Sequence, residues 1–196
     1  MRNQWYGDGR DLIKWGTLIS IAQSQNFTKI IQVAYFRPDS QRPIIKSNNS
    51  LIEIPDSVYN HFRNINDIKR LSWFTGIDIE VIDDLYDKRK RMDYTEKMLP
   101  RITGNNGPLL VFLDPDTGLA VKNPGNKHVT VEEVATIWNA LKPSDCLVLY
   151  QHSFRDTDWL EIKKAEFESA IGCNDVISYR SVKGGTDVVF FAAIKP

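Results

Sequence analysis

Two carboxylates directly follow an apolar run near the middle of the chain. Leu109–Leu113 is continuously hydrophobic, and Asp114 and Asp116 come immediately after it. A second apolar run, residues 146–150, leads through a glutamine to His152. Carboxylates and an imidazole can act as general acids or bases, bind a hard divalent cation, or hydrogen-bond to a ribose or an exocyclic amine. We therefore take Asp114, Asp116 and His152 as the candidate catalytic residues.

The same residues also suit purely structural roles. Residues 114–118 read Asp-Pro-Asp-Thr-Gly, a sequence in which aspartate can cap a turn, proline fixes φ and glycine accepts a positive φ. His152 can equally hydrogen-bond to a neighbouring loop. A turn without a catalytic role therefore stays open as an alternative for this motif.

Glycines and charged residues are also concentrated near the N-terminus. Residues 7–14 read Gly-Asp-Gly-Arg-Asp-Leu-Ile-Lys. Glycine lets the backbone approach a ligand closely, and acidic residues at a helix start interact favourably with the helix dipole. The segment therefore suits either cofactor contact, through Gly7, Asp8, Asp11 and Lys14, or an ordinary helix N-terminus.

Acidic residues follow two other expected strands. Asp39 comes shortly after residues 29–36, and Asp83 comes directly after residues 77–82. Side chains at the carboxyl ends of parallel strands can contribute to a cofactor site. For Asp83 the alternative is a solvated loop.

Hydrophobic spacing predicts helices that alternate with short strands. The expected helices cover residues 11–23, 56–75, 88–99, 131–141 and 158–171. The expected strands cover residues 29–36, 77–82, 109–113, 146–150, 175–182 and 186–194. On the first helix, the apolar residues are expected to face the core, with Asp11 and Lys14 lying away from it. Residues 37–54 are expected to form a small hairpin or a flap over the active site.

Several residues mark the ends of these helices. Thr130 and Glu133 have the spacing of a capping box, which predicts a helix start. Gly76 and Gly172 are placed to end helices in a left-handed conformation. Pro100 is expected to stop the helix that precedes it.

The order of elements predicts the fold class. Short strands separated by helices of about a dozen residues imply βαβ crossovers and a mostly parallel sheet. The last two strands flank a Lys-Gly-Gly turn and predict an antiparallel hairpin. We expect residues 1–196 to form a single Rossmann-like, three-layer α/β domain, with the polar strand ends gathered at one rim of the sheet.

Composition argues against several classes of protein. The chain carries 25 basic and 25 acidic side chains, so no global positive field directs it to nucleic acid. No apolar run approaches the roughly 18 residues that a membrane helix needs. Cys146 and Cys173 are isolated, which argues against a disulfide scaffold and suits a reducing interior. We expect a cytoplasmic protein without membrane contact.

Two separated segments match motifs of a methyltransferase family. Gly7, Asp8, Asp11 and Lys14 match a Gly-Asn/Asp-x-x-Asp-x-x-Lys motif, and residues 113–115 match the start of a later Asp-Pro-Pro-Tyr or Asp-Pro-Phe-Gly motif. In these segments the chain resembles the Rossmann-like methyltransferases of the large-subunit ribosomal RNA adenine-N6 type and the three-Cys-motif partner proteins. The order of elements and the terminal hairpin agree with those families. The resemblance implies S-adenosylmethionine as cofactor, closed over by the N-terminal segment, and nucleic acid as substrate, with Asp114 facing the target amine.

The chain departs from this family pattern at two places. Residues 33–39 lack the glycine-rich turn that follows the first core strand in those enzymes. Asp116 and Thr117 replace the aromatic residue that would stack on a base. Without the glycine turn, we expect cofactor binding to rely on Asp39, Asp83 or residues 7–14, and to be weaker than with a complete motif.

Residues 114–118 also resemble the Asp-x-Asp-Gly-Thr motif of haloacid-dehalogenase-type phosphatases, with the last two residues exchanged. That resemblance implies a nucleophilic Asp114 and an acid at Asp116, around magnesium. In those enzymes the motif belongs to an early strand with an acidic pair well downstream. Here it lies late in the chain, and no such pair is evident on a later strand.

Three functions follow from these observations. The leading hypothesis is a methyltransferase-like enzyme that depends on S-adenosylmethionine and acts on nucleic acid. The first alternative is a phosphoesterase or nuclease that uses Asp114, Asp116 and His152 with Mg²⁺ or Mn²⁺. The second is a catalytically silent Rossmann-like domain that binds a nucleotide or a protein partner.

Overall fold

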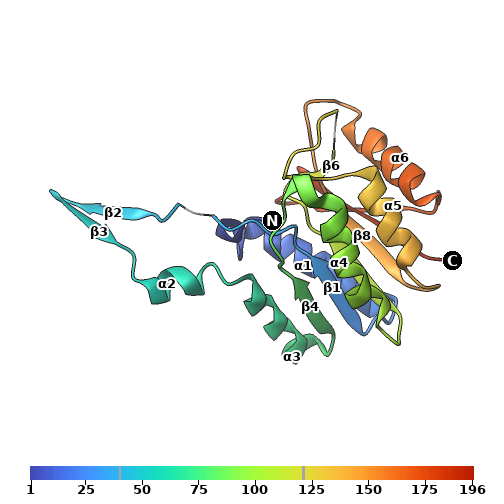
Figure 1. Ribbon diagram of the computed structural model, residues 1–196, viewed down its shortest axis with the longest axis horizontal. Helices are drawn as coiled ribbons and strands as arrows, with labels where there is room; N and C mark the ends of the chain where they lie inside the picture. Colours follow the sequence, from blue (N-terminus) through green and yellow to red (C-terminus); the bar gives the residue numbers. More distant parts are fainter. Residues whose placement is uncertain (40, 121) are drawn as a thin grey trace.

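The structure is built around one six-stranded sheet (Figure 1). The computed structural model describes residues 1–39, 41–120 and 122–196, without the side chain of Trp5. The strand order in the sheet is β4-β1-β5-β8-β10-β9. These strands are β1 (Lys29–Val33), β4 (Asp78–Ile82), β5 (Leu109–Leu113), β8 (Cys146–His152), β9 (Ile177–Arg180) and β10 (Val188–Ile194).

The sheet is mostly parallel. β4, β1, β5 and β8 run in one direction, whereas β10 is antiparallel to both β8 and β9. The predicted C-terminal hairpin is therefore confirmed, and its second strand lies inside the sheet, between β8 and β9. Together with its helices, the sheet forms the predicted three-layer α/β fold.

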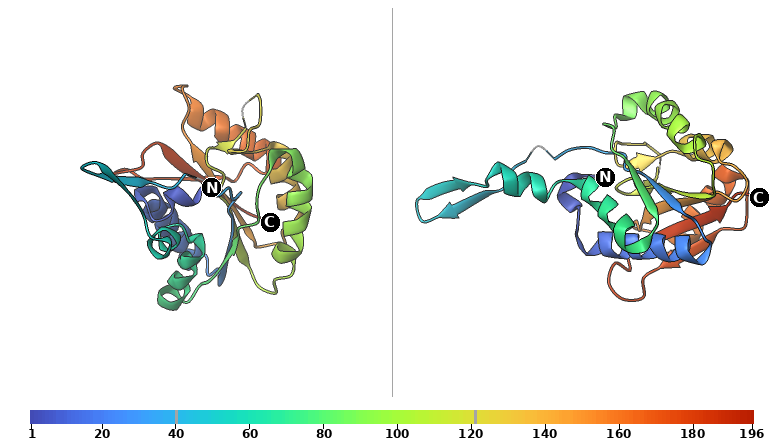
Figure 2. Two further views of the ribbon diagram at one scale, coloured as in Figure 1. Left: turned by 60° about the vertical axis from the view of Figure 1, so that its left-hand side comes forward. Right: turned by 90° about the horizontal axis from the view of Figure 1, so that it is seen from below.

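Helices cover both faces of the sheet, as the views in Figure 2 also show. α1 (Gly9–Ser24) and α3 (Leu71–Thr75) pack on one face, and α4 (Arg91–Thr103), α5 (Val131–Ala140) and α6 (Trp159–Ile171) pack on the other. Successive strand residues point to opposite faces, so Val111 packs with the second group of helices and Phe112 packs with the first. Within the described ranges, no helix has both the length and the apolar character needed to cross a membrane.

Several predicted helix ends are confirmed. Gly76 and Gly172 follow α3 and α6 in the left-handed conformation, with φ of 71° and 61°. Thr130 and Glu133 form the capping box at the start of α5, since each side chain accepts a hydrogen bond from the backbone N–H of the other. These signals are local in the sequence, which is why the pattern alone was sufficient to predict them.

Two helix predictions were wrong in detail. The expected helix 56–75 is divided into α2 (Asp56–His61), a 3-10 helix (Ile65–Arg70) and α3. The division occurs at Asn64, whose side chain accepts a hydrogen bond from a backbone N–H two residues on and so competes with the helical pattern. α4 continues through Pro100 to Thr103, because the proline removes only its own N–H bond to the preceding turn, while its carbonyl oxygen still accepts from the Gly104 N–H.

A two-stranded hairpin lies outside the main sheet. β2 (Ile44–Ser47) pairs with β3 (Ser50–Glu53), and every residue of both strands is exposed. Figure 1 shows that the hairpin projects from the body of the molecule and leads into α2. We call residues 44–64, which contain the hairpin and α2, the arm. The hairpin prediction is therefore confirmed.

The capping box of α5 gives a stability prediction. Thr130→Ala leaves the Glu133 backbone N–H without its acceptor, and we expect the free energy of unfolding to fall by about 1 kcal/mol. Thr136→Ala is the matched control, since Thr136 lies half-buried in the same helix and its hydroxyl bonds only to the helix's own backbone. Urea denaturation of both variants measures the difference, and equal midpoints would show that the box contributes nothing.

Candidate functional site

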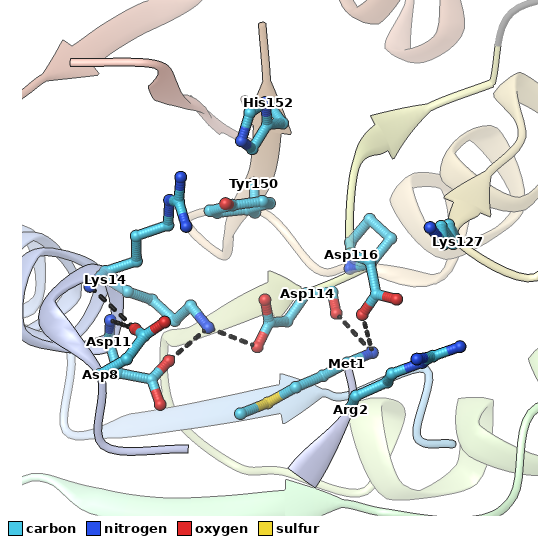
Figure 3. Close-up of a pocket in the computed structure, with 12 residues that line it drawn as sticks. Met1, Arg2, Asp8, Asp11, Lys14, Asp114, Asp116, Lys127, Tyr150 and His152 are labelled. Carbon is cyan, nitrogen blue, oxygen red and sulfur yellow. Dashed lines mark hydrogen bonds and ion pairs between the residues drawn. The ribbon is translucent and has the colours of Figure 1, made fainter. Parts of the chain in front are cut away.

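A polar cavity of about 240 Å³ lies at the rim of the sheet, where β5 and β8 end and α1 begins (Figure 3). It is lined by Met1, Arg2, Asp8, Arg10, Asp11, Lys14, Asp114, Pro115, Asp116, Lys127, Tyr150 and His152. The three candidate catalytic residues therefore line one cavity, together with three of the four residues singled out at the N-terminus, Asp8, Asp11 and Lys14. The fourth, Gly7, contributes a backbone N–H behind it.

Lys14 joins the N-terminal segment to the end of β5. Its Nζ lies 2.7 Å from Asp11 Oδ1 and 3.0 Å from Asp114 Oδ2, and the Gly7 N–H donates to Asp11 Oδ2 at 2.8 Å. The expectation that Asp11 and Lys14 lie away from the core was wrong, since each is only 6% exposed, whereas Leu12 is 77% exposed. Burial is possible because each charged group has an opposite charge in direct contact.

Asp114 has a second partner inside the sheet. The Gln32 side chain on β1 donates from Nε2 to Asp114 Oδ2 at 2.6 Å. Asp114 is only 2% exposed. Both bonds use Oδ2, and across the described ranges Oδ1 accepts no hydrogen bond. Oδ1 is therefore the Asp114 atom that remains available to a ligand.

Burial and charge act in opposite directions at this pair. Burial raises the pKa of Asp114 despite the opposing effect of Lys14. Burial alone would lower the pKa of Lys14, but Asp114 and Asp11 outweigh it and raise that pKa above its usual value. The ammonium group is therefore firmly charged, and it lies between the carboxylates of Asp11 and Asp114.

Asp116 lies next to Asp114 but has different partners. It forms an ion pair with Arg37, and its Oδ1 lies 3.2 Å from the Met1 backbone nitrogen. The same nitrogen also donates to the Tyr35 carbonyl oxygen at 2.9 Å. Asp116 therefore connects the segment after β1 to the segment after β5.

His152 belongs to a three-residue cluster at the opposite side of the cavity. Its Nε2 lies 3.0 Å from Asp187 Oδ2, and its Nδ1 lies 3.0 Å from the Ser153 carbonyl oxygen. Arg10 donates to the same Asp187 oxygen at 2.7 Å. The hydrogen bond to a neighbouring loop, considered for His152 from the sequence, is therefore present, and it connects β8 and β10 to α1.

Two predicted cofactor residues lie elsewhere. The Asp39 N–H donates to Asn3 Oδ1 at 2.9 Å, and Asp39 borders a different surface hollow near the start of the arm. Asp83 accepts a hydrogen bond from Asn66 Nδ2 at 2.7 Å. Neither lines the cavity, because Asp83 follows the edge strand β4, which β1 separates from β5, and Asp39 lies where the chain leads out to the arm.

The turn after Asp116 is fixed by a glycine and a glutamine. Gly118 has a φ of 103°, and a Cβ built on it would lie 2.2 Å from Gln151 Oε1. The same oxygen accepts from the Leu119 N–H at 2.8 Å. Gln151 therefore holds the loop that follows the carboxylates, and it can do so only because residue 118 has no side chain.

Each of the three candidate catalytic side chains already has a protein partner. Asp114 binds Lys14, Asp116 binds Arg37, and His152 binds Asp187. Among the residues that the structure describes, no three His, Cys, Asp or Glu side chains are grouped so that they could share a metal ion. This donor arrangement gives no support to the hydrolase that would use Mg²⁺ or Mn²⁺ at these positions.

Sequence reasoning missed several residues that shape the site. Gln32 gave a usable signal, as a polar residue inside the otherwise apolar stretch Ile30–Val33. Arg10 and Asp187 gave none, because nothing local indicates that residues so far apart in the chain form an ion pair.

In comparisons with known proteins, no family model and no curated protein matches this chain.

Proposed function

We propose that this protein is a methyltransferase-like enzyme that binds an S-adenosyl compound in the rim cavity and acts on nucleic acid. One observation carries the proposal. The two segments that resemble the methyltransferase motifs, residues 7–14 and 113–115, meet through the 3.0 Å contact between Lys14 and Asp114. These positions are 100 residues apart, and a shared site gives a physical reason for both motifs.

The charges around the cavity suit the proposed cofactor. S-adenosylmethionine supplies a methyl group when bound, and it carries an ammonium, a carboxylate and a ribose diol. Arg10 and Lys127 line the cavity and could bind the carboxylate, while Asp8 could accept from the ammonium or from the ribose hydroxyls. Tyr150 offers a ring surface in the same cavity.

The turn after β1 affects how the cofactor would be held. Residues 33–39 contain no glycine, yet Tyr35 has the left-handed φ of 45° that glycine adopts most easily. Its ring turns into the core, where it packs against Tyr86 with 5.0 Å between ring centroids. Met1 covers the carbonyl of this turn. The cofactor would therefore depend on side chains rather than on a glycine backbone, and we expect weaker binding than with a complete motif.

Asp114 is suited to orient a target amine. Lys14 and Gln32 fix Oδ2, so that Oδ1 is presented in one position. An oxygen held in this way can accept a hydrogen bond from an exocyclic amine of a base. Nucleic acid as the source of that amine follows from the resemblance.

Calorimetry with S-adenosylhomocysteine tests the proposal. We expect measurable heat with ligand at about millimolar concentration, where even a site of ~4 kcal/mol is detected. Lys127→Gln should weaken binding about 5- to 10-fold, the loss of one charge-assisted hydrogen bond. Lys122→Gln is the matched control, because Lys122 belongs to the same loop and does not line the cavity.

The outcomes separate the competing functions. If Lys127→Gln and Lys122→Gln both bind S-adenosylhomocysteine as tightly as the unchanged protein, the ligand binds outside this cavity. No heat and no thermal shift with S-adenosylhomocysteine would overturn the proposal. A thermal shift with Mg²⁺ or Mn²⁺ alone, or with a nucleotide alone, would then support the metal-dependent or the silent nucleotide-binding alternative.

A further inference from the structure

A second polar cavity lies where the arm joins the body of the molecule. It is open, has a volume of about 580 Å³, and shares no residue with the rim cavity. It is lined by Asn3, Ser57, Tyr59, Asn60, His61, Arg63, Asn64, Asp67 and Arg70. Hydrogen-bond donors therefore dominate its surface, with a single carboxylate among them.

The two arginines of this cavity lack carboxylate partners. Several arginines of the chain are paired, such as Arg42 with Asp56 and Arg101 with Glu80. Arg63 and Arg70 form no salt bridge with any described residue. Two guanidinium groups that line one cavity, neither in direct contact with a described carboxylate, favour an anionic ligand.

Arg63 also has a donor without an acceptor. Its Nε is buried and has no hydrogen-bond partner in the part of the chain that the structure describes. Its Nη1 donates to the Phe62 carbonyl oxygen at 3.2 Å, and its guanidinium lies 5.3 Å from the centre of the Tyr59 ring. The guanidinium is therefore held in position while one of its donors is left unused, which is costly unless a ligand accepts from it.

The single carboxylate of the cavity is already engaged. Asp67 accepts from Asn64 Nδ2 at 2.8 Å, and its second oxygen lies 4.0 Å from His61 Nδ1. Asn60 and Ser57 have side-chain donors that make no hydrogen bond to a described residue. An anion in this cavity would therefore lie beside the unused donors of Asn60 and Ser57. The Asp67 carboxylate in the same cavity already accepts a hydrogen bond from Asn64.

We propose that the cavity between the arm and the body binds a phosphate group. The planar guanidinium forks of two arginines match the oxygens of a phosphate, and the amide and hydroxyl donors can add neutral hydrogen bonds. The phosphate can belong to a polynucleotide backbone or to a free nucleotide. The polynucleotide form rests on the proposed function, because it gives the substrate of the rim cavity a second point of contact along its backbone.

Fluorescence anisotropy with a labelled single-stranded RNA, without any S-adenosyl compound, tests this site separately from the cofactor site. We expect binding to weaken roughly fivefold or more in Arg63→Gln and in Arg70→Gln, and the dependence of log K on log salt to become shallower by about 1 in each. Arg89→Gln is the matched control, since Arg89 is exposed and pairs only with the nearby Asp87. Arg70 is exposed, so its variant tests the site even if the loss of the Arg63 stacking disturbs the arm.

Free phosphate compounds distinguish the two sources. If AMP and inorganic phosphate bind with the same losses in both arginine variants, and the RNA binds no better than AMP, the ligand is a free nucleotide. If the RNA binds far more tightly, the ligand is a polynucleotide. If no probe binds, or if both arginine variants bind every probe as well as Arg89→Gln does, the phosphate site is refuted. This result would leave the S-adenosylhomocysteine measurement unaffected.

Discussion

Replacing Lys14 by methionine is expected to lower the free energy of unfolding by about 3–5 kcal/mol, the typical cost of removing one partner from a buried ion pair. The variant leaves Asp11 and Asp114 buried without the ammonium that lies within 3.0 Å of both. Lys97→Met is the matched control, because Lys97 is exposed and pairs with Asp84 at the surface, where the expected loss is below about 1 kcal/mol. Urea denaturation at pH 7 measures both.

A double variant identifies the cause of the loss. Asp114→Asn removes the carboxylate, so adding it to Lys14→Met should cost less than the sum of the two single changes. Strict additivity would mean that the two side chains do not interact. A Lys14→Met protein as stable as Lys97→Met would mean that the pair is not buried in solution.

The second large effect is expected at Gly118. Gly118→Ala places a Cβ 2.2 Å from Gln151 Oε1 and forces alanine to adopt a φ of 103°. Backbone strain and overpacking together are expected to lower the free energy of unfolding by about 2–4 kcal/mol. The turn after Asp116 should also shift, because Gln151 can no longer accept from the Leu119 N–H. The loss can be measured by thermal and urea denaturation.

Gly16→Ala is the matched control for this change. Gly16 is an exposed residue within α1, and a Cβ built there meets no other atom within 4 Å. The same substitution should therefore stabilise the protein by about 0.5–1 kcal/mol, as expected for glycine in a helix interior. Opposite signs for the two variants are the expected result, and equal effects would contradict the steric argument.

The sequence was most informative where a structural signal is local. The run Leu109–Leu113 forms the fully buried strand expected from its uninterrupted apolar residues, and Thr130 and Glu133 form the expected capping box. Alternation of helices and strands correctly predicted the layered sheet and its terminal hairpin. In each case the residues that determine the element are neighbours in the chain.

The candidate site was predicted less completely. Amphipathic spacing placed Asp11 and Lys14 away from the core, because a periodic pattern treats every charged residue as exposed. Their burial depends on Asp114, which lies 100 positions beyond Lys14. Asp187 reaches His152 and Arg10 only once β10 has paired with β8. Long-range pairing of this kind has no signature in a single sequence.

The place of β10 in the sheet has a consequence for the order in which the protein can be assembled on the ribosome. β8 and β9 leave the ribosome before β10, yet both pair with β10 and not with each other. Until Val188–Ile194 emerges, the nascent chain exposes an unpaired edge of β8, and β9 has no neighbouring strand with which to pair. An open apolar edge of this kind can pair with the strands of other chains, so the late pairing of β10 leaves this edge of the sheet exposed to aggregation until synthesis is almost complete.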